Sequence, residues 1–192
     1  MHELGSILGP GLLSAPDACV AYECDALTAH RHPPDLVALP TSVEQVQQIV
    51  RICHRHSVPM VARGSGTGLS GGALPVAGGL LLVLSRLDAI LEVDPRHGLA
   101  RVQPGVTNLA VSDAAAPYGM YYAPDPSSQV ACSVGGNVAE NSGGVHCLKY
   151  GLTVHNVLAV TLVTMEGELL TLGSETGETP GLNLLGAVIG SE

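Results

Sequence analysis

Hydrophobic and polar positions follow two periods in the first part of the chain, and each period predicts a type of element. After Thr41, apolar residues recur at helical spacing, and a capping box of Thr41 with Glu44 is expected to open an amphipathic helix. The apolar positions of this helix are Val43, Val46, Ile49, Val50 and Cys53. Short apolar runs at 35–40, 58–62 and 80–84 predict buried strands. The pattern is therefore that of a β-α-β unit followed by a third strand.

The later part of the chain alternates hairpins and helices. Strand patterns broken by short polar turns predict hairpins over 90–103 and 157–172. Further helices are predicted near the N-terminus up to residues 9–11, from Thr107 to about 116, over 134–140 and over 182–189. A loop is expected from residue 13 to residue 34. We place a lobe boundary in the first hairpin, which gives an N-terminal helix and loop over 1–30, a first lobe over 31–95 and a second lobe over 96–192.

A glycine-rich turn follows the second predicted strand and is a candidate binding element. Residues 61–72 read VARGSGTGLSGG, so several positions lack a Cβ and let backbone amides approach a ligand. A row of such amides binds anions. Arg63 is the only cation in this stretch, so an anion would be held mainly by amides. The hydroxyls of Ser65, Thr67 and Ser70 would add to them. This arrangement suits the pyrophosphate of a dinucleotide, and a tight turn without a ligand is the alternative.

Two familiar phosphate-binding loops do not match this turn. The Walker pattern needs a lysine beside Ser or Thr, but the only lysine of the chain is Lys149. Residues 66–71 fit G-x-G-x-x-G, and Asp88 lies where the ribose acid of a Rossmann unit would be expected. However, Pro75 and the glycines at 78–79 interrupt the segment that would have to form the Rossmann helix. The turn is therefore expected to join two strands almost directly.

A second glycine-rich stretch follows an extended, proline-containing connector at 121–128. The helix predicted there would begin at Gly135 and Gly136, with free amides and the positive end of its dipole facing outward. Asn137 and Asn141 can both donate and accept hydrogen bonds, as the edge of a flavin or adenine ring requires. A pair of left-handed helix caps is the alternative interpretation. Two separated glycine turns would suit one long ligand lying between two lobes.

Composition and charge exclude several function classes. The chain of 192 residues has a net charge of −9 and only eight Lys and Arg, so it is not expected to bind nucleic acid. Its apolar runs are far shorter than the roughly 18 residues of a membrane span, and its N-terminus lacks a signal-peptide core. We therefore expect a cytoplasmic protein with reduced cysteines. The histidine pairs at 30/32 and 54/56 fit a loop and a helix end, so no metal site is expected.

Several motifs in a fixed order make the chain similar to a known family. They are the turn at 61–72, APDPSS at 123–128, GGNVAENSGG at 135–144, LKYG at 148–151 and GSE at 190–192. The chain resembles the FAD-binding domain of the vanillyl-alcohol-oxidase-type, or PCMH-type, flavoproteins. Within that superfamily it most resembles the FAD-linked D subunits of bacterial glycolate oxidases, which are relatives of D-lactate dehydrogenases. The resemblance implies an α+β fold of two α/β lobes with FAD between them.

The resemblance also assigns cofactor-binding roles to particular residues. The pyrophosphate would be held by Arg63, Gly64, Ser65, Gly66, Thr67, Gly68, Leu69 and Ser70. The flavin or ribityl region would be lined by Pro124, Asp125 and Ser128. The isoalloxazine and diphosphate would be enclosed by Ser133, Gly135, Gly136, Asn137, Asn141, Gly143 and Gly144, and the adenine side flanked by Tyr150 and Val154. Some relatives attach FAD through a histidine in the first turn. None lies between residues 61 and 79, so FAD is expected to be non-covalent.

The reaction implied by the resemblance is oxidation of glycolate or a related D-2-hydroxy acid, with hydride transfer to flavin N5. In the family, a substrate-binding cap domain that follows the GSE motif carries the catalytic histidine, the cations that bind the substrate carboxylate and often a metal. This chain looks truncated after its FAD domain. We therefore expect weak FAD binding and no turnover. Neither His146 nor His155 is assigned as the catalytic base, because each has an adequate structural explanation.

The partners implied by the resemblance are a second flavin subunit and an iron–sulfur subunit, placed at the inner face of the cell membrane. Two other classes of function stay open. One is a non-catalytic FAD-binding or assembly fragment that docks partner subunits. The other is the FAD domain of a different oxidoreductase of the superfamily, such as an alditol oxidase or a cell-wall reductase.

Overall fold

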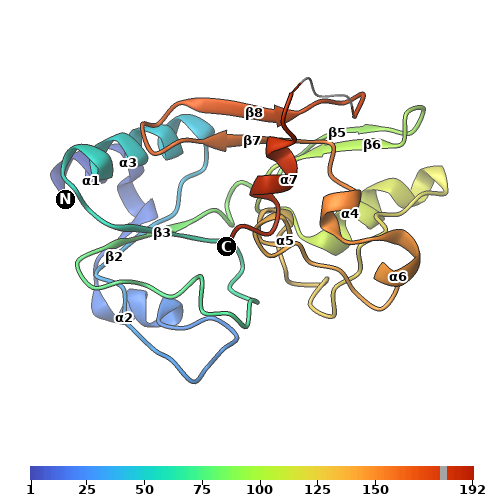
Figure 1. The fold of residues 1–192 in the computed structure, drawn as a ribbon. Coiled ribbons are helices and arrows are strands. Elements are labelled where there is room, and N and C mark those ends of the chain that lie inside the picture. The colour runs from blue at the N-terminus through green and yellow to red at the C-terminus, as the bar shows by residue number, and fades with distance from the viewer. Residues whose placement is uncertain (178–180) are drawn as a thin grey trace. The chain divides into compact units, whose positions relative to one another are not determined.

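The computed structural model describes residues 1–177 and 181–192, and the chain divides into two compact units (Figure 1). The first unit comprises Met1–Leu87 and Val163–Leu170, and the second comprises Asp88–Leu162 and Thr171–Glu192. Helices and strands occur in both, as the sequence patterns predicted. The predicted division into an N-terminal segment and two FAD-binding lobes stays a prediction.

A four-stranded sheet forms the core of the first unit. Across the sheet, its strands are β1 (Leu12–Leu13), β2 (Leu36–Ala38), β4 (Leu80–Val83) and β3 (Met60–Arg63). The last three are parallel, and β1 runs antiparallel to β2. Every side chain of β4 is buried: Leu80 and Leu82 join one hydrophobic cluster, and Leu81 and Val83 join another. Both faces of the sheet are thus covered, which explains the continuous apolar run in the sequence.

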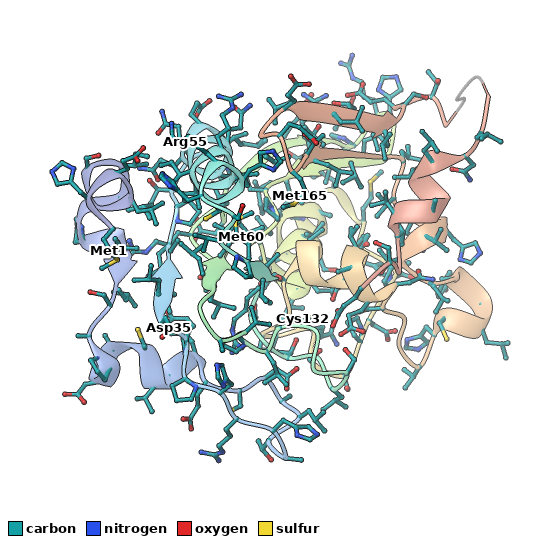
Figure 2. The ribbon with its side chains drawn as sticks, turned by 60° about the vertical axis from the view of Figure 1, so that its left-hand side comes forward. Met1, Asp35, Arg55, Met60, Cys132 and Met165 are labelled. Atoms are coloured by element: carbon teal, nitrogen blue, oxygen red, sulfur yellow. The ribbon has the colours of Figure 1, made fainter. Side chains whose placement is uncertain are left out.

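Helix α3 (Val43–Arg55) packs on one of these clusters, in agreement with its predicted apolar face. Its buried side chains are Val46, Ile49, Val50 and Cys53. Helix α1 (His2–Leu8) lies beside α3 and adds Leu4 and Leu8 to the same cluster (Figure 1). Arg55 lies on the outer side of α3 (Figure 2), where its guanidinium pairs with Glu3 of α1. Helices α1 and α3 therefore cover one face of the sheet that contains β2, β3 and β4.

The N-cap of α3 corrects the predicted capping box by one residue. Ser42, not Thr41, is the N-cap, and its Oγ accepts a hydrogen bond from the Gln45 amide at 3.3 Å. The Gln45 side chain reaches back to the Thr41 amide at 2.8 Å. Gln serves in this motif as well as Glu does, so Gln45 takes the role that was expected of Glu44. Ser42 and Gln45 carry the same three-residue spacing one step later in the chain.

The N-terminal segment holds structure where a loop was expected. Strand β1 pairs with β2 through Leu12 opposite Ala38. Helix α2 (Pro16–Cys19) follows, and short 3-10 turns η1 (Gly9–Gly11) and η2 (Val20–Tyr22) flank these two elements. A two-residue strand and a single helical turn are too short to show a period in the sequence. The loop prediction for residues 13–34 was therefore wrong for this part.

The hairpin of β7 (Ala159–Val163) and β8 (Leu169–Gly173) confirms the prediction over 157–172. Its turn belongs to the first unit and docks on α3. The carbonyl oxygen of Gly167 accepts hydrogen bonds from Gln47 Nε2 and from Arg51 Nη2, each at 2.8 Å. Gly167 has a positive φ of 77°, and a Cβ there would lie 2.8 Å from the Arg51 guanidinium. Glycine is thus required at this turn by both conformation and packing.

The second unit contains the other predicted hairpin and helices. Its regular elements are β5 (Ile90–Asp94), β6 (Leu99–Val102), α4 (Asn108–Ala115), η3 (Ala116–Tyr118), α5 (Val134–Glu140), α6 (Cys147–Tyr150), η4 (Thr153–His155) and α7 (Leu184–Val188). Strands β5 and β6 are antiparallel. Thr107 caps α4, because its hydroxyl accepts a hydrogen bond from the Ala110 amide at 3.3 Å. Within the described residues, no helix is long and apolar enough to span a membrane.

Candidate functional site

The glycine-rich turn of the first unit runs from residue 64 to residue 79 and contains neither helix nor strand. This confirms that the G-x-G-x-x-G match is not a Rossmann motif. The expectation of a nearly direct connection was wrong, however. Strands β3 and β4 are parallel, so the chain must return from the carboxyl end of one to the amino end of the other. The turn is long for that geometric reason.

The backbone of this turn presents unpaired donors. Gly66 and Gly71 have positive φ values of 71° and 84°, which glycine adopts without strain. Among the described residues, no acceptor pairs with the backbone amides from Gly64 to Leu69. Consecutive free amides on a glycine turn form a concave donor surface that favours an anion. The local geometry thus supports the predicted anion-binding character of the turn.

Arg63 faces into its own unit. It is buried, and its Nη1 donates a hydrogen bond to the Cys24 carbonyl at 2.9 Å. Its guanidinium carbon lies 5.9 Å from the centre of the Tyr22 ring. Burial lowers the pKa of Arg63, while the nearby Asp25 opposes that shift. Arg63 therefore anchors the segment at 22–25 beneath the turn, and its predicted contact with a pyrophosphate stays a prediction.

Asp25 is a buried acid that sequence reasoning missed. It is only 5% exposed, and its Oδ1 accepts a hydrogen bond from the Leu27 amide at 2.8 Å. Its Oδ2 has no hydrogen-bond partner within residues 1–177 and 181–192. The segment shows no period or motif in the sequence, so only the fold reveals that Asp25 and Arg63 lie near each other.

In the second unit, the start of α5 is closed by protein groups. The Val134 amide donates to the Val106 carbonyl and the Gly135 amide to the Pro104 carbonyl, both at 2.8 Å. Ser133 Oγ accepts from the Gly136 amide at 3.3 Å. The expectation of free amides at this helix start was therefore wrong. A Cβ on Gly135 would lie 2.7 Å from the Pro104 side chain, so close packing rather than a ligand requires this glycine.

Asn137 and Asn141 of the same region differ in what their side chains do. Asn141 adopts the left-handed conformation that ends α5, and its Oδ1 accepts a hydrogen bond from the Val154 amide at 2.9 Å. This matches the helix-cap alternative. Asn137 is 2% exposed, and its Nδ2 has no hydrogen-bond partner in the part of the chain that the structure describes. A buried, unpaired donor is costly, so Asn137 Nδ2 is a candidate for a ligand contact.

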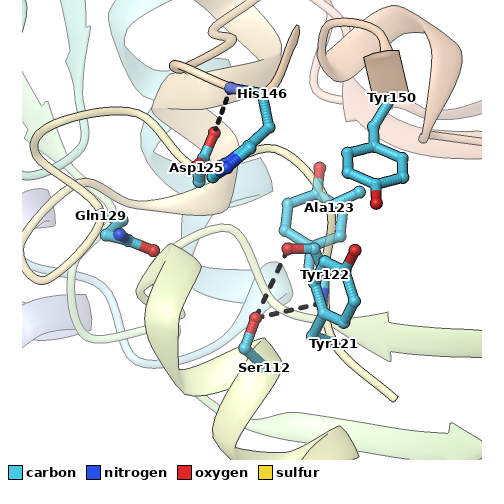
Figure 3. A pocket seen from close by; sticks show the side chains of 8 residues that line it. All are labelled: Ser112, Tyr121, Tyr122, Ala123, Asp125, Gln129, His146 and Tyr150. Carbon is cyan, nitrogen blue, oxygen red and sulfur yellow. Dashed lines mark hydrogen bonds and ion pairs between the residues drawn. The ribbon is translucent and has the colours of Figure 1, made fainter.

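A pocket of about 320 Å³ lies in the second unit (Figure 3). Its lining residues are Ser112, Tyr121, Tyr122, Ala123, Asp125, Gln129, His146 and Tyr150. Asp125 and Tyr150 belong to the predicted cofactor residues, whereas the other six were not assigned to a site. The only available signal was a concentration of aromatic side chains, because three of the five tyrosines of the chain line this pocket.

Hydrogen bonds and ring contacts shape the pocket wall. Ser112 Oγ accepts a hydrogen bond from the Tyr122 amide at 3.0 Å. The rings of Tyr121 and Tyr150 meet edge to face at 6.2 Å. Burial raises the pKa of Tyr122 to about 12, so this phenol stays neutral at ordinary pH. The pocket thus combines aromatic surfaces with a few polar groups, which is typical of small-molecule sites.

Asp125 and His146 form the carboxylate–imidazole pair of the pocket. Asp125 Oδ2 lies 2.5 Å from His146 Nδ1, and the Asp125 side chain is less exposed than that of His146, at 21% against 63%. The hydrogen bond from His146 holds the pKa of Asp125 below its ordinary value. His146 is thus engaged by a carboxylate, which supports its predicted structural explanation.

The predicted cofactor residues fall into both units. The first unit holds Arg63, Gly64, Ser65, Gly66, Thr67, Gly68, Leu69 and Ser70. The second holds Pro124, Asp125, Ser128, Ser133, Gly135, Gly136, Asn137, Asn141, Gly143, Gly144, Tyr150 and Val154. Each unit, taken by itself, brings its own group together around a glycine-rich segment. Their assignment to FAD stays a prediction.

The donor chemistry of each unit fits FAD. The first unit offers the free amides that a pyrophosphate needs, and the second offers the buried Asn137 Nδ2. In the ranges 1–177 and 181–192, no three His, Cys, Asp or Glu side chains gather in a way that could hold a metal ion.

Two curated relatives share much of this sequence. The chain is 59% identical over 185 residues to glycolate oxidase subunit GlcD of Escherichia coli strain K12, covering 95% of this chain and 37% of that protein. It is 37% identical over 178 residues to a D-lactate dehydrogenase of Archaeoglobus fulgidus, covering 92% and 40% respectively. The chain therefore spans well under half the length of these relatives.

Solved structures share the fold. Alkyldihydroxyacetonephosphate synthase matches with a TM-score of 0.83 and 26% identity, over 96% of this chain and 35% of that one. p-Cresol methylhydroxylase matches with a TM-score of 0.79 and 23% identity, over 96% and 36%. The second likeness concerns the fold alone, and it confirms the predicted PCMH-type α+β architecture.

The family assignment follows from a match that covers most of the chain. The family described as "FAD binding domain" matches residues 34–173, which include every predicted cofactor residue. The first glycine turn, α5 and the pocket all lie within those bounds. The chain belongs to the family of FAD-binding domains, and FAD is the cofactor of that family.

Proposed function

We propose that this chain is the FAD-binding part of a flavoprotein oxidoreductase that oxidises glycolate or a related D-2-hydroxy acid. The observation that carries the proposal is the 59% identity over 185 residues with a glycolate oxidase subunit. The similarity to a D-lactate dehydrogenase supports the wider substrate class, because lactate and glycolate are both 2-hydroxy acids.

Within this function, the residues of the chain bind and orient the cofactor. The free amides from Gly64 to Leu69 would hold the pyrophosphate, and Asn137 Nδ2 would donate to a polar edge of the cofactor. When bound, FAD supplies the acceptor for the hydride that leaves C2 of the hydroxy acid. We propose non-covalent attachment, since residues 61–79 contain no histidine that could form a covalent bond.

The chain is not assigned a catalytic base. His146 lines the pocket, but its Nδ1 already contacts the Asp125 carboxylate. We propose that the chain alone binds FAD weakly and does not oxidise substrate. We further propose that the protein works with a second flavin subunit and an iron–sulfur subunit at the inner face of the cell membrane. That proposal is supported by the name of its relative, which is itself a subunit.

A chimera tests the substrate assignment. In the chimera, this chain replaces the matching 185 residues of the Escherichia coli subunit, within the complex of that protein. The proposal predicts that the chimera retains flavin and oxidises glycolate, whereas a matched chimera carrying Gly66→Ala loses flavin. A chimera that retains flavin but oxidises no 2-hydroxy acid would contradict the proposal. It would favour a non-catalytic FAD-binding module, or another oxidoreductase of the superfamily.

A further inference from the structure

The Asp125–His146 pair joins two segments that are distant in sequence (Figure 3). Asp125 lies in the connector at 121–128, and His146 ends the glycine segment that leads from α5 into α6. Besides the contact of Oδ2 with the His146 ring, Asp125 Oδ1 accepts a hydrogen bond from the His146 backbone amide at 3.4 Å. One carboxylate therefore holds both the ring and the backbone of the same residue.

Gly144 packs against the same residue, Asp125. Its φ is 148°, and a Cβ built there would overlap the Asp125 carbonyl and carboxylate oxygens. The glycine segment thus lies directly against Asp125, with no room for any side chain at Gly144. The packing contact and the two contacts to His146 act on the same short stretch of backbone.

Little else ties this stretch to the protein. Ser142 is held by two backbone hydrogen bonds. Its amide donates to the Asn137 carbonyl at 3.0 Å, and its carbonyl accepts from the Thr153 amide at 2.9 Å. Among the described residues, no other hydrogen bond joins residues 143–146 to a segment beyond α6. Asp125 is therefore the polar group on which the position of residues 143–146 depends.

We propose that Asp125 and His146 form a latch that positions the glycine segment 143–146 and one wall of the adjoining pocket. Asp125 then serves cofactor binding as a positioning residue acting through His146, and not through direct contact with FAD. This inference rests on the proposed function in so far as residues 143 and 144 meet the cofactor.

Neighbouring rings and charges are consistent with the latch. The centres of the His146 and Tyr150 rings lie 6.5 Å apart. Lys149 Nζ lies 4.8 Å from the centre of the Tyr150 ring. The Tyr150 ring in turn meets Tyr121. Moving His146 would therefore also disturb Tyr150 and Tyr121, two of the three tyrosines that line the pocket.

The test compares variants of the purified chain by two readouts. The first is hydrogen exchange at the amides of residues 143–147 without FAD, and the second is the dissociation constant for FAD. Asp125→Ala and His146→Leu should each speed exchange there. Each should also weaken FAD binding by about two- to fivefold, the range expected for a partly exposed pair. The double variant should be no worse than Asp125→Ala, because that substitution already removes both the ring contact and the backbone contact to His146.

His146→Asn is the conservative variant. Asn Nδ2 occupies nearly the same place as His Nδ1, so it keeps the donor to Asp125 without the ring. Exchange and FAD affinity should stay within about twofold of the parent, in contrast to His146→Leu. A role of the ring itself would instead make both substitutions equally harmful, which would overturn the latch.

A second pair in the same unit supplies the matched control. His97 Nδ1 lies 2.7 Å from Asp94 Oδ2 in the turn between β5 and β6. Asp94→Ala and His97→Leu should change neither exchange at 143–147 nor FAD affinity. Unchanged exchange in Asp125→Ala would overturn the latch, and faster exchange with unchanged FAD affinity would overturn its link to the cofactor. A parent chain without any FAD affinity would refute the proposed function, while the exchange readout would still decide the latch.

Discussion

Asn137 is a residue at which the effects of a substitution on ligand binding and on folding can be measured separately. Its Nδ2 is buried without a partner in the described part of the chain, whereas Asn108, fully buried as well, donates from Nδ2 to the Pro124 carbonyl at 3.0 Å. The two asparagines lie in one unit and differ in whether the donor is already used. This contrast allows a paired prediction.

Asn137→Leu should weaken FAD binding by about two- to tenfold, because a donor to the cofactor is lost. The free energy of unfolding of the FAD-free chain should change by less than about 1 kcal/mol, since no donor of this side chain is satisfied there. Asn108→Leu should instead lower the free energy of unfolding by about 1–3 kcal/mol. Calorimetry with FAD and urea unfolding measure both quantities. Equal losses of stability in the two variants would contradict this reading of Asn137.

Gly66 and Gly78 offer a second comparison at the scale of single residues. Their φ values are 71° and 70°, so alanine should cost about 1 kcal/mol at either place through backbone strain. A Cβ at Gly78 meets nothing within 4 Å, while one at Gly66 would overlap the Arg63 guanidinium. Gly66→Ala should therefore be the more destabilising and should abolish FAD retention, whereas Gly78→Ala should retain FAD. Thermal unfolding and titration with FAD check this, and equal behaviour of the two variants would count against it.

At this scale, sequence reasoning recognised residue types better than it recognised their contacts. It singled out Arg63, Asp125 and Asn141, but their partners are Cys24, His146 and Val154, which lie 39, 21 and 13 residues away. No local period or motif encodes such pairings. Asn137 was identified as a polar group with a role, yet only burial shows that its donor is unpaired.

At the scale of elements, the amphipathic helix α3 was predictable because its apolar face repeats over several turns. The hairpins were predictable from strand patterns that flank a turn. Strand β1 and helix α2 were not, because they are too short to show a period. The order β1-β2-β4-β3 was also out of reach, since pairing between distant strands is set by packing.

The docking of the β7–β8 turn on α3 gives the prediction at this scale. Arg51→Ala removes one of the two donors to the Gly167 carbonyl and should lower the free energy of unfolding by about 1–2 kcal/mol. Arg55, also on α3, forms an exposed pair with Glu3 of α1, so Arg55→Ala should lower the free energy of unfolding by less than Arg51→Ala does. Urea unfolding of both variants compares them directly. A larger loss for Arg55→Ala would show that the hairpin turn is not held in this way.

At the scale of the whole molecule, acid pH should reduce stability through carboxylates that histidines stabilise. Hydrogen bonds from His56, His97 and His146 lower the pKa values of Glu3, Asp94 and Asp125. A carboxyl group with a lower pKa in the folded state stabilises the fold above its ordinary pKa. That contribution is lost as pH falls through the lowered folded-state value.

The free energy of unfolding should therefore decrease as pH falls below the ordinary Asp value of 3.8. Asp94→Asn should flatten this acid-side decrease, because the residue no longer titrates. Urea unfolding over a pH series of the parent and the variant measures the slopes. An unchanged slope in Asp94→Asn would show that this pair contributes nothing to the acid response.

The measurement that tests the central claim most directly is a titration of the purified 192-residue chain with FAD, followed by the absorption of the flavin. FMN serves as the comparison, because it lacks the adenylate part and the pyrophosphate. The account predicts saturable binding of one FAD per chain, weaker binding of FMN, and loss of FAD binding in Gly66→Ala. A folded chain that leaves FAD free at every concentration would contradict it.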